Sequence, residues 1–260
     1  MVSLHHNKFK FKIMSLQNKN VIIAGGTTGI GLATAKAFIN AGANVLITGR
    51  NSANLQKASE EINNANLKTL VSDTSNLNDI SVLEKAVSDS GNKIDVLFLN
   101  AGIATFTPIE LTTEADFDAQ FNTNVKGHYF TLQKLLPHLA DGSSVIFTSS
   151  VVATGAGIGS SVYSATKGAL NKIAQIAANE LAGRKIRVNI VSPGPIQTPG
   201  LESVVPVEAV SQLAAATALQ RVGNADEIAN VVLFLASDAA SYISGTDLAV
   251  DGGYLTYALK

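Results

Sequence analysis

Three polar side chains between positions 150 and 167 have the types and spacing needed for proton-transfer chemistry. Tyr163 and Lys167 are four residues apart in a stretch expected to be helical, so both side chains lie on one face of that helix. Ser150 comes just after an apolar strand. We therefore expect a hydroxyl, a phenol and an ammonium group to converge on one reacting atom. Taken singly, such residues are more often a strand-end cap, a packed phenol and a solvated lysine, so the interpretation depends on their joint occurrence.

A glycine-rich turn near the start of the chain predicts a nucleotide site. Gly25, Gly29 and Gly31 lie between an apolar strand and a helical pattern. Missing side chains there let the backbone approach a pyrophosphate, and the helix N-terminus offers free N–H groups to it. The spacing is GxxxGxG rather than GxGxxG, and a tight strand–helix connection would also explain it.

The end of the second expected strand bears on the choice of cofactor. A carboxylate there would bind the ribose hydroxyls of NAD and repel the 2′-phosphate of NADP. The chain has Arg50 instead, and a guanidinium can pair with a phosphate. The sequence thus favours NADP(H) over NAD(H), with Thr27 and Thr28 as nearby hydroxyl donors; the alternative is a solvated arginine at a strand end.

The elements that must position these residues alternate regularly. Apolar strands are expected at 21–24, 44–50, 67–73, 93–100, 143–150, 185–192 and 246–253, and helical patterns lie between them, the longest over 113–139. Such alternation predicts one doubly wound α/β domain over 14–260, with a parallel sheet of about seven strands and helices on both faces. Four of the six prolines lie between Pro193 and Pro206, which indicates an excursion at about 195–217. Residues 1–13 are expected to be a disordered extension.

Composition excludes several other classes. The 260 residues carry a net charge of −1, which gives no electrostatic reason to bind nucleic acid or an anionic membrane. No apolar run is long enough to span a bilayer. Cysteine is absent and the four histidines have no metal-ligand spacing, so we expect a cytoplasmic protein without a metal.

From about position 19 to 253 the chain resembles the short-chain dehydrogenase/reductase family. The turn AGGTTGIG, which includes Ile30, is similar to the family's TGxxxGIG, with Ala24 in place of the usual threonine. The resemblance assigns adenine contacts to Asp73 and Thr74. It also assigns a cofactor-binding NAG motif to Asn100, Ala101 and Gly102, where Leu99 replaces the commoner first asparagine.

The same resemblance covers the catalytic residues. Asn124, Ser150, Tyr163 and Lys167 match the family's four catalytic positions, and Pro193, Gly194, Ile196 and Thr198 match the segment that holds the nicotinamide carboxamide. The family implies that Lys167 also holds the nicotinamide ribose, that Asn124 positions a water in a proton relay, and that the protein is a homotetramer.

These residues predict a reversible carbonyl reductase. Hydride transfer from a reduced nicotinamide to a ketone or aldehyde leaves an oxyanion, which Ser150 would stabilise and Tyr163 would protonate. A free phenol titrates near pH 10, and we expect Lys167 and the positive oxidised nicotinamide to lower that pKa. The region after Thr198 is mostly small and aliphatic, which favours a small neutral substrate, although these residues could instead pack against the fold or another subunit.

Two other functions stay open at this point. A 3-oxoacyl-[acyl-carrier-protein] reductase would share every motif, and Lys126, Lys172, Arg184 and Lys185 could dock its acidic carrier, although they form no cluster. A non-catalytic NADP-sensing regulatory protein could use the same fold, but would not need all four catalytic residues.

Overall fold

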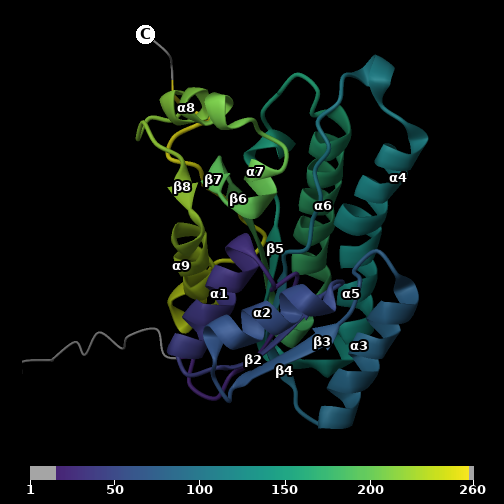
Figure 1. Ribbon diagram of the computed structural model, residues 1–260. Helices are drawn as coiled ribbons and strands as arrows, with labels where there is room; N and C mark the ends of the chain where they lie inside the picture. The colour runs from purple at the N-terminus through teal and green to yellow at the C-terminus, as the bar shows by residue number, and fades with distance from the viewer. Residues whose placement is uncertain (1–15, 258–260) are drawn as a thin grey trace, which may run out of the picture.

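The computed structural model describes residues 16–257 and has a seven-stranded parallel sheet at its centre (Figure 1). The strand order is β3-β2-β1-β4-β5-β6-β9. The strands are β1 (Asn20–Ala24), β2 (Asn44–Gly49), β3 (Leu67–Val71), β4 (Ile94–Leu99), β5 (Leu139–Thr148), β6 (Arg187–Pro193) and β9 (Asp247–Val250). This confirms the predicted doubly wound α/β fold. The expected extension at 1–13 lies outside the described residues.

Helices cover both faces of the sheet and bury alternate residues of each strand. On one face, α1 (Gly29–Asn40), α2 (Ser52–Ile62) and α9 (Ala225–Ala236) pack over strand residues such as Val21 and Ile23. On the other face, α3 (Leu77–Ser90), α5 (His128–Leu135) and α6 (Ser161–Glu180) pack over Ile22 and Ala24. The strands are apolar on both sides because both faces are buried.

The strand order of the sheet determines where a ligand can bind. The chain runs outward from β1 through β2 to β3, then returns to the centre at β4 and runs through β5 to β6 on the other side. A crevice therefore opens beyond the carboxyl ends of β1 and β4, where such sheets bind ligands. The loops after these strands are held together there, because the N–H groups of Asn100 and Ala101 both donate to the carbonyl of Ala24, at 3.0 and 2.8 Å.

The expected long helical region over 113–139 is divided into several parts. It begins with α4 (Glu114–Phe121), continues through a π-helical turn at Asn122–Gly127 and α5, and ends in a 3₁₀ turn at Leu136–His138. Pro137 sits in that 3₁₀ turn. It lacks an N–H to donate and cannot continue the helix, so β5 starts directly after it.

The excursion after β6 contains its own short elements. These are β7 (Ile196–Gln197), α7 (Pro199–Glu202), α8 (Val207–Ala215) and β8 (Gly223–Asn224), with β7 paired to β8. Figure 1 shows α7 and α8 beyond the end of the sheet, on the same side as the N-terminal end of α6. They are therefore placed to cover the crevice.

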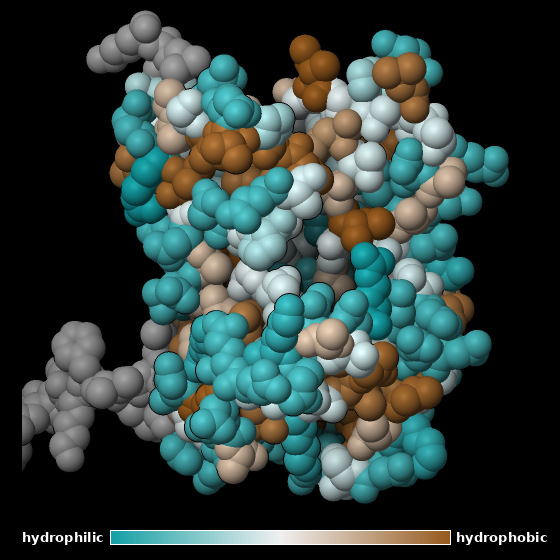
Figure 2. All heavy atoms as spheres, in the orientation of Figure 1, coloured by the Kyte–Doolittle hydropathy of each residue, from teal (hydrophilic) through white to brown (hydrophobic). Residues whose placement is uncertain are grey.

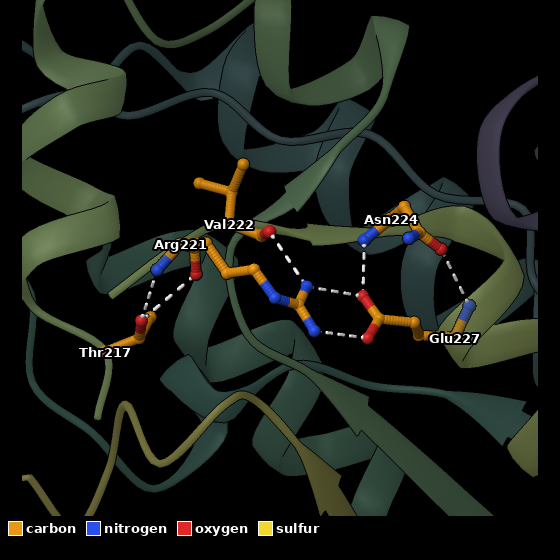
Figure 3. Close-up of polar contacts among 5 residues, drawn as sticks. All are labelled: Thr217, Arg221, Val222, Asn224 and Glu227. Carbon is orange, nitrogen blue, oxygen red and sulfur yellow. Dashed lines mark hydrogen bonds and ion pairs between the residues drawn. The ribbon is translucent and has the colours of Figure 1, made fainter. Parts of the chain in front are cut away.

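The return of this excursion is fixed by polar contacts (Figure 3). The guanidinium of Arg221 donates to both carboxylate oxygens of Glu227, at 2.8 and 2.6 Å. Glu227 also accepts from the N–H of Asn224 at 2.9 Å, and the Asn224 side chain accepts from the N–H of Glu227 at 3.1 Å, a capping box that begins α9. The Thr217 hydroxyl accepts from the backbone N–H of Arg221 at 3.2 Å and donates to the backbone carbonyl of Arg221 at 3.0 Å. The excursion thus leaves the sheet after β6 and returns at the start of α9, where these contacts hold the chain.

Candidate active site

The structure brings Ser150, Tyr163 and Lys167 together at the carboxyl end of β5. Tyr163 and Lys167 lie in the first turns of α6, and the Lys167 ammonium nitrogen is 5.6 Å from the centre of the Tyr163 ring. Lys167 is buried and donates to the carbonyl of Thr148 at 2.9 Å. Ser150 caps a short 3₁₀ turn directly after β5, and its hydroxyl lies close enough to the phenol to act on the pKa of Tyr163. The predicted convergence of a serine, a phenol and a lysine is present.

Burial is the largest influence on the pKa values of two of these groups. It raises the pKa of Tyr163 to about 12, a rise that the Ser150 hydroxyl opposes. It also lowers the pKa of Lys167 to about 8. The sequence predicts that Lys167 and the positive oxidised nicotinamide together lower the pKa of Tyr163. Among the protein groups alone, desolvation of the phenol has the largest effect. A phenolate near neutral pH therefore needs additional positive charge beside Tyr163.

Asn124 occupies the π-helical turn between α4 and α5 and is fully buried. Its side-chain oxygen accepts from the N–H of Ile103 at 2.9 Å, and its amide donates to the carbonyl of Ile103 at 2.9 Å and to the hydroxyl of Thr166 at 3.1 Å. The side chain thus connects the loop after β4 to α6, and both of its amide protons are engaged in doing so. A π turn also interrupts the regular pattern of backbone hydrogen bonds, which is common at functional sites.

His128, one turn after Asn124, lies behind the site without taking part in it. The ring is fully buried, packs edge-on against Phe147 with 6.3 Å between centroids, and faces the carbonyl of Ala101. Among the described residues neither ring nitrogen makes a well-formed hydrogen bond. Burial, followed by the charge of Lys167, lowers the pKa of His128 to about 3. The imidazole is therefore neutral at physiological pH.

A cleft of about 380 Å³ adjoins these residues at the crevice between β1 and β4. Nine of its lining residues are ones that the sequence assigned to the cofactor: Gly25, Thr27, Thr28, Arg50, Asp73, Thr74, Asn100, Ala101 and Gly102. Six others were not predicted: Gly49, Asn51, Asn54, Ser72, Ile103 and Thr123. Asn51 had a recognisable signal, because an asparagine before a helical pattern is a typical N-cap, and its side chain does accept from the N–H of Asn54 at 3.0 Å.

The glycines of the turn create the space for a dinucleotide. Gly25 has a φ of +82°, and a Cβ placed on it would lie 2.6 Å from the Cα of Ala101. A Cβ on Gly31 would lie 1.9 Å from the carbonyl oxygen of Gly25. Only glycine allows the backbone to take this path, so the residues present fit the pyrophosphate of a dinucleotide.

The remaining predicted cofactor residues lie beside the cleft without lining it. Gly29, Ile30 and Gly31 begin α1, Pro193 ends β6 with Gly194 directly after it, and Ile196 lies in β7. Thr198 approaches the glycine turn closely, since a Cβ on Gly29 would lie 3.2 Å from its methyl group. The segment after β6 therefore borders the glycine turn at Thr198, although the cleft itself ends before it.

Two polar groups in the cleft differ in their availability. Arg50 is exposed at the edge, and no ion pair or hydrogen bond engages its guanidinium within residues 16–257. Asp73 is partly committed, because one of its oxygens accepts from the N–H and the hydroxyl of Ser75, both at 2.8 Å. Arg50 is thus the charged group that a ligand can use without breaking an existing contact.

Comparison with known proteins agrees with this geometry. A family model described as enoyl-(acyl carrier protein) reductase matches residues 24–255. An uncharacterized oxidoreductase of Methylorubrum extorquens is 40% identical over 243 residues, which are 92% of this chain and 98% of that protein. The chain belongs to the short-chain dehydrogenase/reductase family. It is therefore an oxidoreductase of a family that uses NAD(P)(H) and acts on CH–OH and C=O groups.

Two further family members show the range of the similarity. The 3-oxoacyl-[acyl-carrier-protein] reductase of Thermotoga maritima is 36% identical over 245 residues, covering 92% of this chain and 99% of that protein. A short-chain dehydrogenase/reductase structure from Mycobacterium marinum has a TM-score of 0.88 at 31% identity, and the match covers 94% of this chain and 98% of that one. The whole described sheet is thus shared with solved family members.

Two features are absent from the part of the chain that the structure describes. Among residues 16–257 no helix is long and apolar enough to cross a bilayer. The same residues contain no group of three or more His, Cys, Asp or Glu side chains that could hold a metal ion.

Proposed function

We propose that this family member is an NADPH-dependent carbonyl reductase that converts a ketone or aldehyde to an alcohol and runs in reverse as a secondary-alcohol dehydrogenase. The observation that carries the proposal is the convergence of Ser150, Tyr163 and Lys167 beside a glycine-lined cleft. The cofactor, when bound, supplies the hydride and, in its oxidised form, a positive charge.

Each protein group has a stated role in this proposal. Tyr163 gives its proton to the substrate oxygen in reduction and takes it back in oxidation. Ser150 donates a hydrogen bond to the same oxygen and stabilises the negative charge that develops there. Lys167, anchored on Thr148, adds positive charge near the phenol and holds the nicotinamide ribose. Asn124 fixes the loop after β4 against α6, and the family resemblance implies that it also positions a water in the proton relay.

We assign NADP(H) rather than NAD(H) because of Arg50. Its guanidinium is exposed at the cleft, where the adenosine ribose of the cofactor would lie. Thr27 and Thr28 line the same cleft and can add hydroxyl donors. The Arg50 guanidinium can pair bidentately with a 2′-phosphate, which NAD lacks.

The substrate region supports a small neutral carbonyl compound. The two charged residues over 195–217 are both glutamates, and Glu202 is already engaged by the side-chain amide of Gln197. Figure 2 shows hydrophobic residues gathered over α7 and α8, above a hollow in the face of the molecule. Such a lid would exclude water from the reacting atoms and would not attract an anionic substrate.

A 3-oxoacyl-[acyl-carrier-protein] reductase is the second candidate, since a protein of that name is 36% identical. The position of the basic residues argues against it. Arg184 and Lys185 directly precede β6, at the amino end of the sheet, and Arg184 pairs with Asp141 there. Tyr163 is at the other end of α6, about 26 Å away at the rise of an α-helix. Two of the four candidate carrier-docking residues are therefore remote from the site.

We also propose a cytoplasmic homotetramer. Phe117 of α4, Tyr129 of α5 and Ile176 of α6 are 44%, 47% and 50% exposed and offer apolar surface that a second subunit can bury. Tyr242 and Tyr257 are exposed in the C-terminal region, which we propose as a second interface. Sedimentation equilibrium would measure the mass directly.

The test is a kinetic screen of neutral ketones and a 3-oxoacyl thioester with NADPH and NADH, following the nicotinamide absorbance. The proposal predicts turnover of neutral ketones with NADPH preferred. Selective turnover of the thioester would favour the second candidate. Tight NADPH binding with no turnover of any substrate would instead favour a non-catalytic NADP-sensing protein.

A further inference from the structure

Phe106, in the loop between β4 and the 3₁₀ turn at Ile109–Leu111, contacts the proposed acid–base residue itself. Its ring centroid is 5.7 Å from that of Tyr163, and the two planes are inclined at 83°, an edge-to-face arrangement. Phe106 is nevertheless 42% exposed. One part of the ring thus packs on the phenol while another part faces outward.

The loop that carries Phe106 is held on both sides of this residue. Before it, the N–H of Thr105 donates to the side chain of Gln120 at 3.2 Å, and Gln120 is buried. After it, the N–H of Thr107 donates to the carbonyl of Gly159 at 2.8 Å. Gly159 belongs to the segment between Ser150 and Tyr163, so the two loops form one continuous wall. These two bonds hold the backbone on both sides of Phe106, and the contact with Tyr163 holds its ring.

The loops around the ring are uncharged and carry several apolar side chains. Neither 101–109 nor 150–163 contains a charged residue. Ile158 is fully exposed on the same loop as Gly159, and Leu255 approaches that loop at Gly155, where an added Cβ would lie 3.2 Å from it. A charged substituent would find no counter-ion in these loops, whereas an apolar one would be desolvated against them.

From this geometry we infer that Phe106 determines specificity and that the site prefers a ketone with an aryl group next to the carbonyl. This inference rests on the proposed carbonyl reductase function. A substrate oxygen bound to the Tyr163 hydroxyl brings its substituents toward the ring that packs on Tyr163. A flat aromatic substituent can make an offset or edge contact with the outward part of Phe106, and such contacts add to the gain from burial alone. A short alkyl group makes no such contact.

The experiment compares acetophenone with butan-2-one in the wild type and three Phe106 variants. Phe106→Leu keeps an apolar side chain without the ring, Phe106→Tyr keeps the ring, and Phe106→Ala removes both. We expect the ratio of kcat/KM for acetophenone over butan-2-one to fall about 3- to 10-fold in Phe106→Leu and Phe106→Ala, mainly through the KM for acetophenone. Phe106→Tyr should retain the ratio. Ile109→Ala, a substitution of an exposed apolar residue in the same connection, is the control and should also retain it.

An unchanged ratio in Phe106→Leu and Phe106→Ala would overturn the inference, as would an equal loss for both ketones, which would mean that Phe106 only supports Tyr163. Ligand-observed NMR of the same ketones with the NADPH-bound protein separates this inference from the proposed function. Absence of turnover with a Phe106-dependent preference for binding acetophenone would refute the reductase and support the aryl site. Absence of any binding preference would refute the aryl site.

Discussion

The buried imidazole of His128 predicts a specific loss of stability in acid. The folded state lowers the pKa of His128 from 6.5 to about 3, through burial and the charge of Lys167. The unfolded chain therefore binds the proton more tightly, and the free energy of unfolding falls as the pH decreases below the unfolded pKa. Since one pKa unit corresponds to about 1.4 kcal/mol, His128 should account for a loss of about 2 kcal/mol between roughly pH 7 and pH 5.

The variant His128→Leu tests this prediction, because leucine has a similar volume and can pack against Phe147 without titrating. Urea unfolding at the two pH values gives the acid-induced loss for each protein. We expect that loss to be smaller in His128→Leu than in the wild type by about 2 kcal/mol. His138→Gln removes a histidine that instead contacts Glu84 at 2.9 Å, and should not diminish the loss. Equal losses in the wild type and His128→Leu would refute the reasoning.

Two further predictions concern the cofactor cleft. Arg50→Asp should lower the ratio of kcat/KM for NADPH over NADH by about 10- to 100-fold, because a charge-assisted contact with the 2′-phosphate is replaced by repulsion; an unchanged ratio would remove Arg50 from the site. Gly31→Ala should weaken NADPH binding, measured by calorimetry, and lower the Tm, because its Cβ would meet the carbonyl oxygen of Gly25. The matched control is Gly183→Ala, where the added Cβ has no atom within 4 Å and both quantities should stay close to the wild type.

Most of the fold can be predicted from the sequence, because the local strand and helix patterns agree with the motifs that place the site. Alternating apolar strands and helical patterns predict the parallel sheet, and the glycine turn and YxxxK spacing predict which edge carries the site. The π turn at Asn122–Gly127 has no comparable signature. The sequence over 113–139 predicts one helical region. The change from α-helical to π-helical hydrogen bonding becomes visible only in the structure, where Asn124 packs between Ile103 and Thr166.

The site was less predictable where it depends on burial or on loop paths. The sequence predicts that Lys167 and the oxidised nicotinamide lower the pKa of the phenol, but it carries no signal for desolvation, which is the largest effect among the protein groups. Thr123 and Ser72 also line the cleft. Each precedes a predicted site residue in the sequence, but neither belongs to a motif that would have indicated its role. Phe106 is 57 residues before Tyr163, and nothing in a linear pattern indicates that their rings meet.

The most direct test of the central claim is the variant Tyr163→Phe. It removes one hydroxyl while keeping the ring that packs against Phe106 and lies near Lys167. We expect kcat for ketone reduction to fall by about 10²- to 10⁴-fold, as for the loss of a general acid, while the affinity for NADPH stays within about twofold of the wild type. Near wild-type turnover by Tyr163→Phe would contradict the assignment of Tyr163 as the proton donor.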